Sequence, residues 1–234
     1  MTEFVPFVVL AVVISAFALV IRHMTKLKNR LGQRPDELEI AVASSGYFPS
    51  PAAERVTAEL GRIPRLEGQR FQVTALLARE DPAGMRYVVD YFAPGGSARS
   101  STHRGTLFGV RLTDRELPRF VFKHSSIRMP KLLVAGLDKL ITLRYPGFER
   151  VPLEGVSPEL AHCLFYAEDR DTGVRLLDAG VIEVLSNHDG WGLESTGSWL
   201  VAEKENLGRS TVPEISTVCE QLGEFERLAD AFGL

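Results

Sequence analysis

An uncharged apolar segment near the start of the chain constrains its architecture more than any other feature. The segment runs from Phe4 to Ile21, and its one polar side chain is that of Ser15. A helix of this length rises about 27 Å, close to the roughly 30 Å thickness of a bilayer's hydrocarbon core. We therefore expect residues 4–21 to form a single transmembrane helix that holds the rest of the chain on one side of a membrane.

A cleaved secretory signal is the alternative interpretation of this segment. Such a signal has a positively charged start, a shorter apolar stretch and a cleavage site made of small residues. Here the segment is preceded by Met1, Thr2 and Glu3 and is followed directly by Arg22. These flanks favour a retained anchor over a cleaved signal.

Basic residues follow the apolar segment, and they are Arg22, Lys26, Lys28, Arg30 and Arg34. Positively charged flanks of a membrane span stay on the cytoplasmic side. We therefore expect a single-pass protein of the cell membrane, with its N-terminus outside. Residues 22–35 are predicted to form a basic juxtamembrane connector, and residues 36–234 a cytoplasmic α+β domain.

Helical and strand-like patterns both occur in the range 36–234. Acidic residues early in 36–45, followed by Gly46, predict a short helix. Alternating or short apolar runs between turn residues predict strands over 70–79, 85–93, 105–112, 119–124, 148–153 and 161–167, and a hairpin over 191–202. Helices are expected over 171–185 and 213–232. The predicted fold class is α+β: a single N-terminal transmembrane helix followed by a mainly antiparallel sheet with two packing helices.

The order of these pieces includes three recognisable stretches after the apolar segment. They are the strand Tyr87–Tyr91, the connection Arg111–Phe120 and the hairpin from Gly190 to Leu200. In this order the chain resembles a family of uncharacterised single-pass membrane-anchored proteins that is common in actinobacteria. The resemblance implies an anchored domain and supplies no catalytic residues.

The cysteines and histidines of the chain form no familiar catalytic motif. Cys163 and Cys219 are far apart and have no CxxC spacing. His162 precedes Cys163 in a predicted strand, where adjacent side chains point to opposite faces, which argues against a thiol–imidazole pair. His188 belongs to a turn sequence without nearby metal ligands. The sequence therefore predicts no catalytic residue, no cofactor and no metal.

A polar connection, residues 97–104, gathers hydroxyl groups, a histidine and two arginines, Arg99 and Arg104. Such a loop can offer backbone N–H groups and guanidinium groups to an anion. It lacks the spacing of a phosphate-binding P-loop. A solvated hairpin loop is the alternative interpretation.

Charge is divided unevenly along the chain, although the net charge is only −3. Residues 86–144 contain eleven Lys and Arg against four Asp and Glu, whereas residues 149–234 contain six against seventeen. If the aromatic residues of the strands face the core, then the basic residues share the opposite face. The candidate site for a lipid headgroup or another anion comprises Arg86, Arg99, Arg104, Arg111, Arg119 and Lys123. The alternative is that acidic helices cover this face and pair with it.

These features predict a membrane-tethered, non-catalytic interaction module, such as an accessory or assembly subunit of a membrane protein complex. Its expected partners are the membrane, through residues 4–21, other membrane proteins and anionic lipid headgroups. Nucleic acid is not expected as a partner, because the chain is acidic overall and has no basic-aromatic recognition motif. The alternative function is a domain that binds or transforms an anionic ligand around Arg99–Arg104 at the membrane surface.

Overall fold

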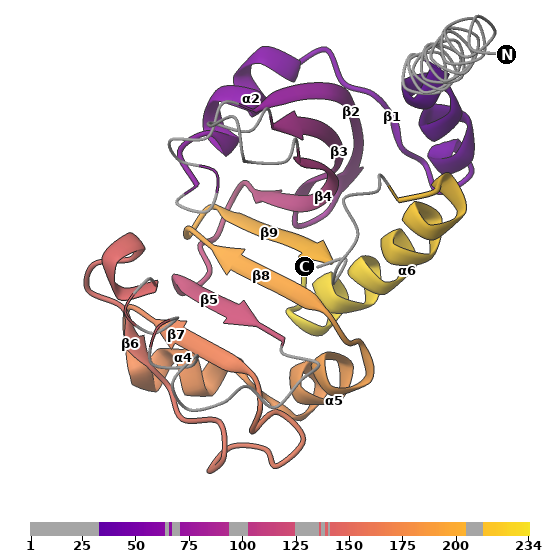
Figure 1. The fold of residues 1–234 in the computed structure, drawn as a ribbon. Coiled ribbons are helices and arrows are strands. Elements are labelled where there is room, and N and C mark those ends of the chain that lie inside the picture. The colour runs from indigo at the N-terminus through magenta and orange to yellow at the C-terminus, as the bar shows by residue number, and fades with distance from the viewer. Residues whose placement is uncertain are drawn as a thin grey trace, which may run out of the picture.

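The computed structural model describes residues 33–63, 66, 71–93, 103–124, 136, 139, 141–204 and 213–234. Within these residues a sheet of nine strands has the order β1-β2-β3-β4-β9-β8-β5-β7-β6, and every described pairing is antiparallel (Figure 1). The strands are β1 (Phe48–Pro49), β2 (Gln72–Asp81), β3 (Gly84–Ala93), β4 (His103–Leu112), β5 (Phe120–Lys123), β6 (Glu149–Arg150), β7 (Leu164–Ala167), β8 (Trp191–Ser195) and β9 (Trp199–Lys204).

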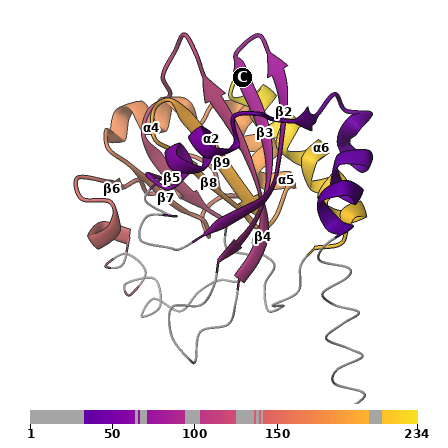
Figure 2. The same ribbon diagram turned by 90° about the horizontal axis from the view of Figure 1, so that it is seen from above.

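Helices lie on both faces of this sheet (Figure 2). Among the described residues they are a helix over 33–43, α2 (Ala53–Leu60), a short helical stretch over 141–144, α4 (Arg170–Leu176), α5 (Ala179–Asn187) and α6 (Ile215–Ala231). The helix over 33–43 ends in a turn at Gly46, whose φ of +82° suits a residue without a Cβ. Because helices cover both faces, neither face is available as a whole for a membrane surface.

The strand order is the main feature that the chain order does not reveal. Strands β1 to β4 follow one another as neighbours, but the hairpin β8–β9 is inserted between β4 and β5. Val110 of β4 therefore lies opposite Leu200 of β9, and Phe122 of β5 lies opposite Leu193 of β8. This insertion joins the two halves of the chain in one sheet and places the end of β5 beside the turn that precedes β8.

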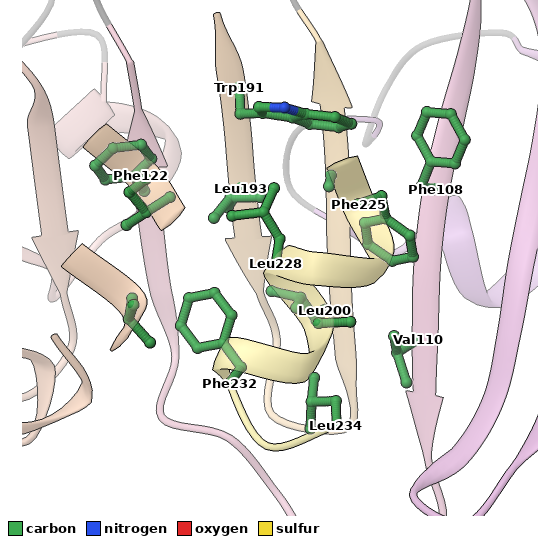
Figure 3. Packing of buried hydrophobic residues seen from close by; sticks show 14 of the residues in the cluster. Phe108, Val110, Phe122, Trp191, Leu193, Leu200, Phe225, Leu228, Phe232 and Leu234 are labelled. Carbon is green, nitrogen blue, oxygen red and sulfur yellow. The ribbon is translucent and has the colours of Figure 1, made fainter. Parts of the chain in front are cut away.

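One face of the sheet packs against α6 through aromatic side chains. Phe225 of α6 is fully buried, and its ring stacks on Phe108 of β4 with a centroid distance of 5.5 Å (Figure 3). The indole of Trp191 meets Phe108 edge to face at 5.8 Å. Such aromatic contacts add to the burial of apolar area, so this cluster fixes the position of α6 on the sheet.

The opposite face carries a second apolar core beneath α2. Val56 and Leu60 of α2 pack there with Tyr87 of β3 and Trp199 of β9. Phe108 lies opposite Val88 in the ladder, and Tyr87, next to Val88, points to the other face. Tyr87 and Phe108, which were expected to share one core face, therefore lie on opposite faces.

The predicted fold class is wrong. Among the residues that the structure describes, no helix has both the length and the apolar character needed to cross a membrane. The segment 4–21, on which the transmembrane prediction falls, lies outside the described residues, as do residues 22–32 of the connector. The described part of the chain also packs more than two helices on the sheet.

Two element boundaries also differ from those predicted from the sequence. The single helix predicted over 171–185 is two helices, because the side chain of Asp178 caps a new helix by accepting from the N–H of Val181 at 2.9 Å. The strand predicted over 161–167 begins only at Leu164. Residues 161–163 form a turn in which the N–H of Cys163 donates to Leu160 at 2.8 Å.

Candidate functional site

Arg86, the first residue of the predicted basic face, is buried beneath the end of α6. Its guanidinium lies 3.0 Å from Asp81 and donates to Asp230 at 2.9 Å and to the carbonyl oxygen of Leu234 at 2.7 Å. Its side chain is 4% exposed. The positive charge of Arg86 is therefore already paired with carboxylates of the same chain.

The other described basic residues of this set do not share a face with Arg86. Arg111 donates to Glu59 of α2 at 2.7 Å, on the face opposite α6. Arg119 donates to Glu168 at 3.1 Å and lies over the ring of Phe148. Lys123 is half-buried at the end of β5, whereas Arg99 and the side chain of Arg104 lie outside the described residues. The structure therefore does not gather these side chains into one anion-binding surface.

An open hollow of about 600 Å³ lies where the β2–β3 hairpin meets the last residues of the chain. Its charged lining residues are Asp81, Arg86, Asp114, Arg115 and Asp230. Arg115 donates to the carbonyl oxygen of Gly233. Because the lining mixes both signs and its arginines already bind oxygen atoms of the chain, an anionic ligand would have to compete with these contacts.

A deeply buried ion pair joins the helix over 33–43 to the sheet. The guanidinium of Arg34 donates to both oxygens of Asp90, at 2.9 and 3.1 Å, and to the carbonyl oxygen of Pro213 at 2.6 Å. Thr106 donates to the same carboxylate at 2.9 Å. Asp90 is fully buried and Arg34 is 6% exposed. This bidentate pairing fixes the start of the helix against β3 and β4, and the bond to Pro213 ties it to the segment that leads into α6.

This pair was not predicted from the sequence, which placed Arg34 in an exposed basic connector. The sequence did contain one indication of a buried ion pair, because Asp90 is the one charged residue in the apolar run Tyr87–Tyr91. A buried carboxylate needs a cationic partner. The sequence does not say which of the many arginines that partner is.

The N-terminal edge of the molecule, defined here as the helix over 33–43 together with β1 and β2, leaves part of a strand open. Residues of β1 pair only with Leu77 and Ala78 of β2, and Ser50 donates to Leu76 at 3.0 Å. No described strand pairs with this side of β2 between residues 72 and 75. An open groove of about 580 Å³ runs between this part of β2 and α2, and its apolar lining includes Ala53, Ala58, Phe71, Val73, Ala75 and Leu76.

Exposed apolar side chains also occur at the N-terminal edge. Ile40 of the helix over 33–43 is 76% exposed, and Phe48 of β1 is 60% exposed. Single exposed apolar residues are common on protein surfaces. Here they occur beside residues 72–75 of β2, which no described strand pairs on this side, so this edge combines backbone without a described strand partner and exposed apolar side chains.

A group of side chains at the other end of the sheet could hold a metal ion. His124, His162 and Cys163 each place a ligand atom within 4.8 Å of the others. The argument that His162 and Cys163 point to opposite faces of a strand does not hold, because both lie in the turn before β7. Burial lowers the pKa of His124, the carboxylate of Asp189 opposes that shift, and His162 adds to it.

The carboxylate of Glu224 in α6 connects this helix to the hairpin β8–β9 through hydrogen bonds and ion pairs. It accepts from the indole N–H of Trp191 at 2.8 Å and from the Lys204 ammonium at 2.5 Å, and it lies 4.0 Å from His188. Burial acts to raise the pKa of this carboxyl, but the bonds from Lys204 and Trp191 bring it below its usual value. The ionised carboxylate is therefore the form that holds the two elements together.

His188, close to Glu224, makes the free energy of unfolding depend on pH. Burial lowers the pKa of its imidazole; Glu224 of α6 opposes that shift, while Arg227 of α6 and Lys204 of β9 add to it. The unfolded chain therefore binds a proton more readily than the folded one below about pH 6.5. We expect stability to decrease as the pH falls from 7 to 5, and the decrease to be smaller in His188→Gln. Urea unfolding at several pH values measures this difference, and identical pH profiles would contradict it.

Comparison of the chain with protein-family models and with curated proteins gives no match. Among solved structures, it is similar to the crystal structure of the mycobacterial trehalose monomycolate transport factor A, TtfA. The identity is 10% and the TM-score is 0.48, with 86% of this chain and 94% of that chain covered. A likeness at this level assigns no activity, ligand or partner to this chain.

Proposed function

We propose that this chain is a membrane-attached interaction module that binds an extended segment of a neighbouring membrane protein at its N-terminal edge. In this proposal the apolar segment 4–21 attaches the chain to the cell membrane, and the domain lies on the cytoplasmic side. The support for attachment is the composition of that segment and the basic residues Arg22, Lys26, Lys28 and Arg30 that follow it. The module acts as an accessory or assembly subunit.

The observation that carries the proposal is the open side of β2 beside the groove under α2. Unpaired strand edges add extended segments through backbone hydrogen bonds, and adjacent grooves select side chains. Residues 72–75 supply the backbone groups, and Ala58, Phe71 and Val73 line the space for apolar side chains. The partner that fits is a short extended stretch with apolar residues at alternate positions.

The position of this edge favours a partner in the same membrane. The helix over 33–43, which belongs to the edge, is where the chain enters the domain after the apolar segment. Arg34 holds the start of that helix through its bonds to Asp90 and Pro213. The entry point and the open strand are thus parts of one rigid unit, so attachment at residues 4–21 would keep β2 near the membrane.

Site-specific photocrosslinking in native membranes tests this proposal. A photoreactive residue at Gln72, which is exposed on β2, is expected to capture a distinct membrane protein. The matched control is the same residue at Arg175, exposed on α4, where the adduct is expected to be missing. A chain without residues 4–21 should lose the adduct at Gln72 if attachment positions the edge.

Ala58→Lys provides a second test without disturbing the fold. Ala58 is exposed on α2 and lines the groove, and lysine is a good helix former. A charged side chain in the groove is expected to abolish the adduct at Gln72. The proposal is contradicted if both photoreactive positions give the same products. It also fails if Gln72 captures only this chain itself or a second copy of it.

A further inference from the structure

The sheet topology places His124 next to Cys163. Phe122 pairs with Phe165 and Lys123 pairs with Leu164, where the ladder ends, so His124 and Cys163 are the residues directly beyond its last pair. The register of β5 and β7 therefore brings these two residues close together, and their ligand atoms lie within 4.8 Å of each other.

A tight turn adds a second imidazole to this pair. The N–H of Ala161 donates to Pro158 at 3.3 Å, and that of Cys163 donates to Leu160 at 2.8 Å. This turn sets the ring of His162 against the ring of His124, with centroids 4.9 Å apart and the planes at 82°. Two rings and one thiol thus converge from the end of β5 and the turn before β7.

His124 provides independent evidence that a ligand belongs here. Its side chain is only 2% exposed, and its Nε2 atom lies 3.2 Å from the carboxylate of Asp189. With the proton on Nε2 and donated to Asp189, the Nδ1 atom carries a lone pair. That Nδ1 atom is buried and has no hydrogen-bond partner among the described residues. A buried polar atom without a partner is unfavourable unless something else binds it.

We propose that His124, His162 and Cys163 bind one zinc-type divalent metal ion, with Asp189 as the positioning residue for His124. Imidazole nitrogen and thiolate sulfur are the ligands that Zn²⁺ takes in proteins. A carboxylate that accepts from the far nitrogen of a ligating histidine is the usual outer partner in such sites. Three ligands from the protein leave a fourth position for water or another donor.

The distances show what metal binding would change. In a tetrahedral zinc site, with bonds of roughly 2.0–2.3 Å, ligand atoms lie about 3.3–3.7 Å apart. The three atoms here lie within 4.8 Å of one another, so the widest pair must approach by about 1 Å. His162 is half-buried and belongs to a turn, which lets its ring provide this movement. His124 and Cys163 are buried, and their backbone N–H groups donate to the carbonyl oxygens of Trp191 and Leu160.

Binding would link three segments that are distant in the sequence. His124 directly follows β5, His162 and Cys163 precede β7, and Asp189 lies in the turn before β8. Because β5 lies between β7 and β8, the ion and the contact of His124 with Asp189 would together hold the same end of three neighbouring strands. This site is separate from the N-terminal edge, so the metal proposal and the interaction proposal can fail independently.

Metal titration of the full chain, purified without a histidine tag, tests the proposal. We expect Zn²⁺ to bind with a stoichiometry of one per chain. We expect Co²⁺ to give the visible bands of a four-coordinate ion and a thiolate charge-transfer band in the ultraviolet. Cys163→Ser should remove the thiolate band, whereas Cys219→Ser, at the other cysteine, should keep it. Absence of that band from the unaltered chain, or its survival in Cys163→Ser, would overturn the proposal.

Asp189→Asn separates a positioning role from a general effect on folding. The side chain of Asp189 is 76% exposed, so its replacement leaves the core intact. We expect it to weaken Zn²⁺ binding by roughly 10- to 100-fold, as loss of such an outer partner does. His162→Gln, at a half-buried turn residue, should remove Zn²⁺ binding altogether. Unchanged affinity in both variants would also overturn the proposal, and Trp fluorescence verifies that each variant is folded.

Discussion

Replacing Arg34 with Met is expected to lower the free energy of unfolding by about 3–5 kcal/mol. The change leaves the carboxylate of Asp90 fully buried without its cationic partner. Thr106 still donates to that carboxylate, but a neutral hydroxyl does not balance a buried charge. Urea unfolding of the full chain, followed by the fluorescence of Trp191 and Trp199, measures the loss because both indoles are buried.

A second variant distinguishes the ion pair from simple loss of packing. In Arg34→Met with Asp90→Asn, no buried charge remains, so a large part of the lost stability should return. Arg55→Met is the matched control, because Arg55 is 65% exposed and lies 3.9 Å from its carboxylate partner Glu59. We expect that control to change stability by no more than about 0.5 kcal/mol. An Arg34→Met chain as stable as this control would show that the buried pair does not hold the helix.

Phe225→Ala is expected to destabilise the protein by about 3–5 kcal/mol, as other deletions of buried aromatic rings do. The ring is fully buried between α6 and the sheet and stacks on Phe108 (Figure 3). Its removal opens a cavity that the surrounding strands cannot close, because β4 and β9 are paired on both sides. Hydrogen exchange should show the loss of protection first in α6.

Phe48→Ala is the matched control for this experiment. It removes the same side chain at a position that is 60% exposed, so the expected change is within about 0.5 kcal/mol. Similar unfolding midpoints for the two variants would contradict the packing of α6 on the face of the sheet that carries Phe108. A large loss for Phe225→Ala alone supports the packing described here.

Patterns that depend on neighbouring residues were predicted well. The strands expected over 85–93 and 105–112 correspond to β3 (Gly84–Ala93) and β4 (His103–Leu112), and the helix expected over 213–232 contains α6. Turn residues mark where these elements stop, and at Gly84 the requirement is steric. Its φ is +149°, and a Cβ there would overlap the carbonyl oxygen of Arg111.

Arrangements that depend on distant residues were not predicted. The sequence pattern was interpreted as a sheet with one buried face. In the structure both faces are buried, because Phe108 packs in the core beneath α6 and Tyr87 packs in the core beneath α2. The sequence pattern does not reveal the second core because α2 and α6 come from opposite ends of the domain. For the same reason the basic residues Arg86 and Arg111, expected together, pair with carboxylates on different faces.

The sequence by itself determined the positions of the long elements β3, β4 and α6, because periodicity, caps and turn residues act over a few positions. It also supplied the apolar segment 4–21, whose attachment to a membrane stays a prediction. Only the tertiary structure decided that Arg34 meets Asp90 and that His124 meets Cys163. Such contacts follow from the pairing of strands far apart in the chain, and that pairing depends on the packing of the whole sheet rather than on local sequence.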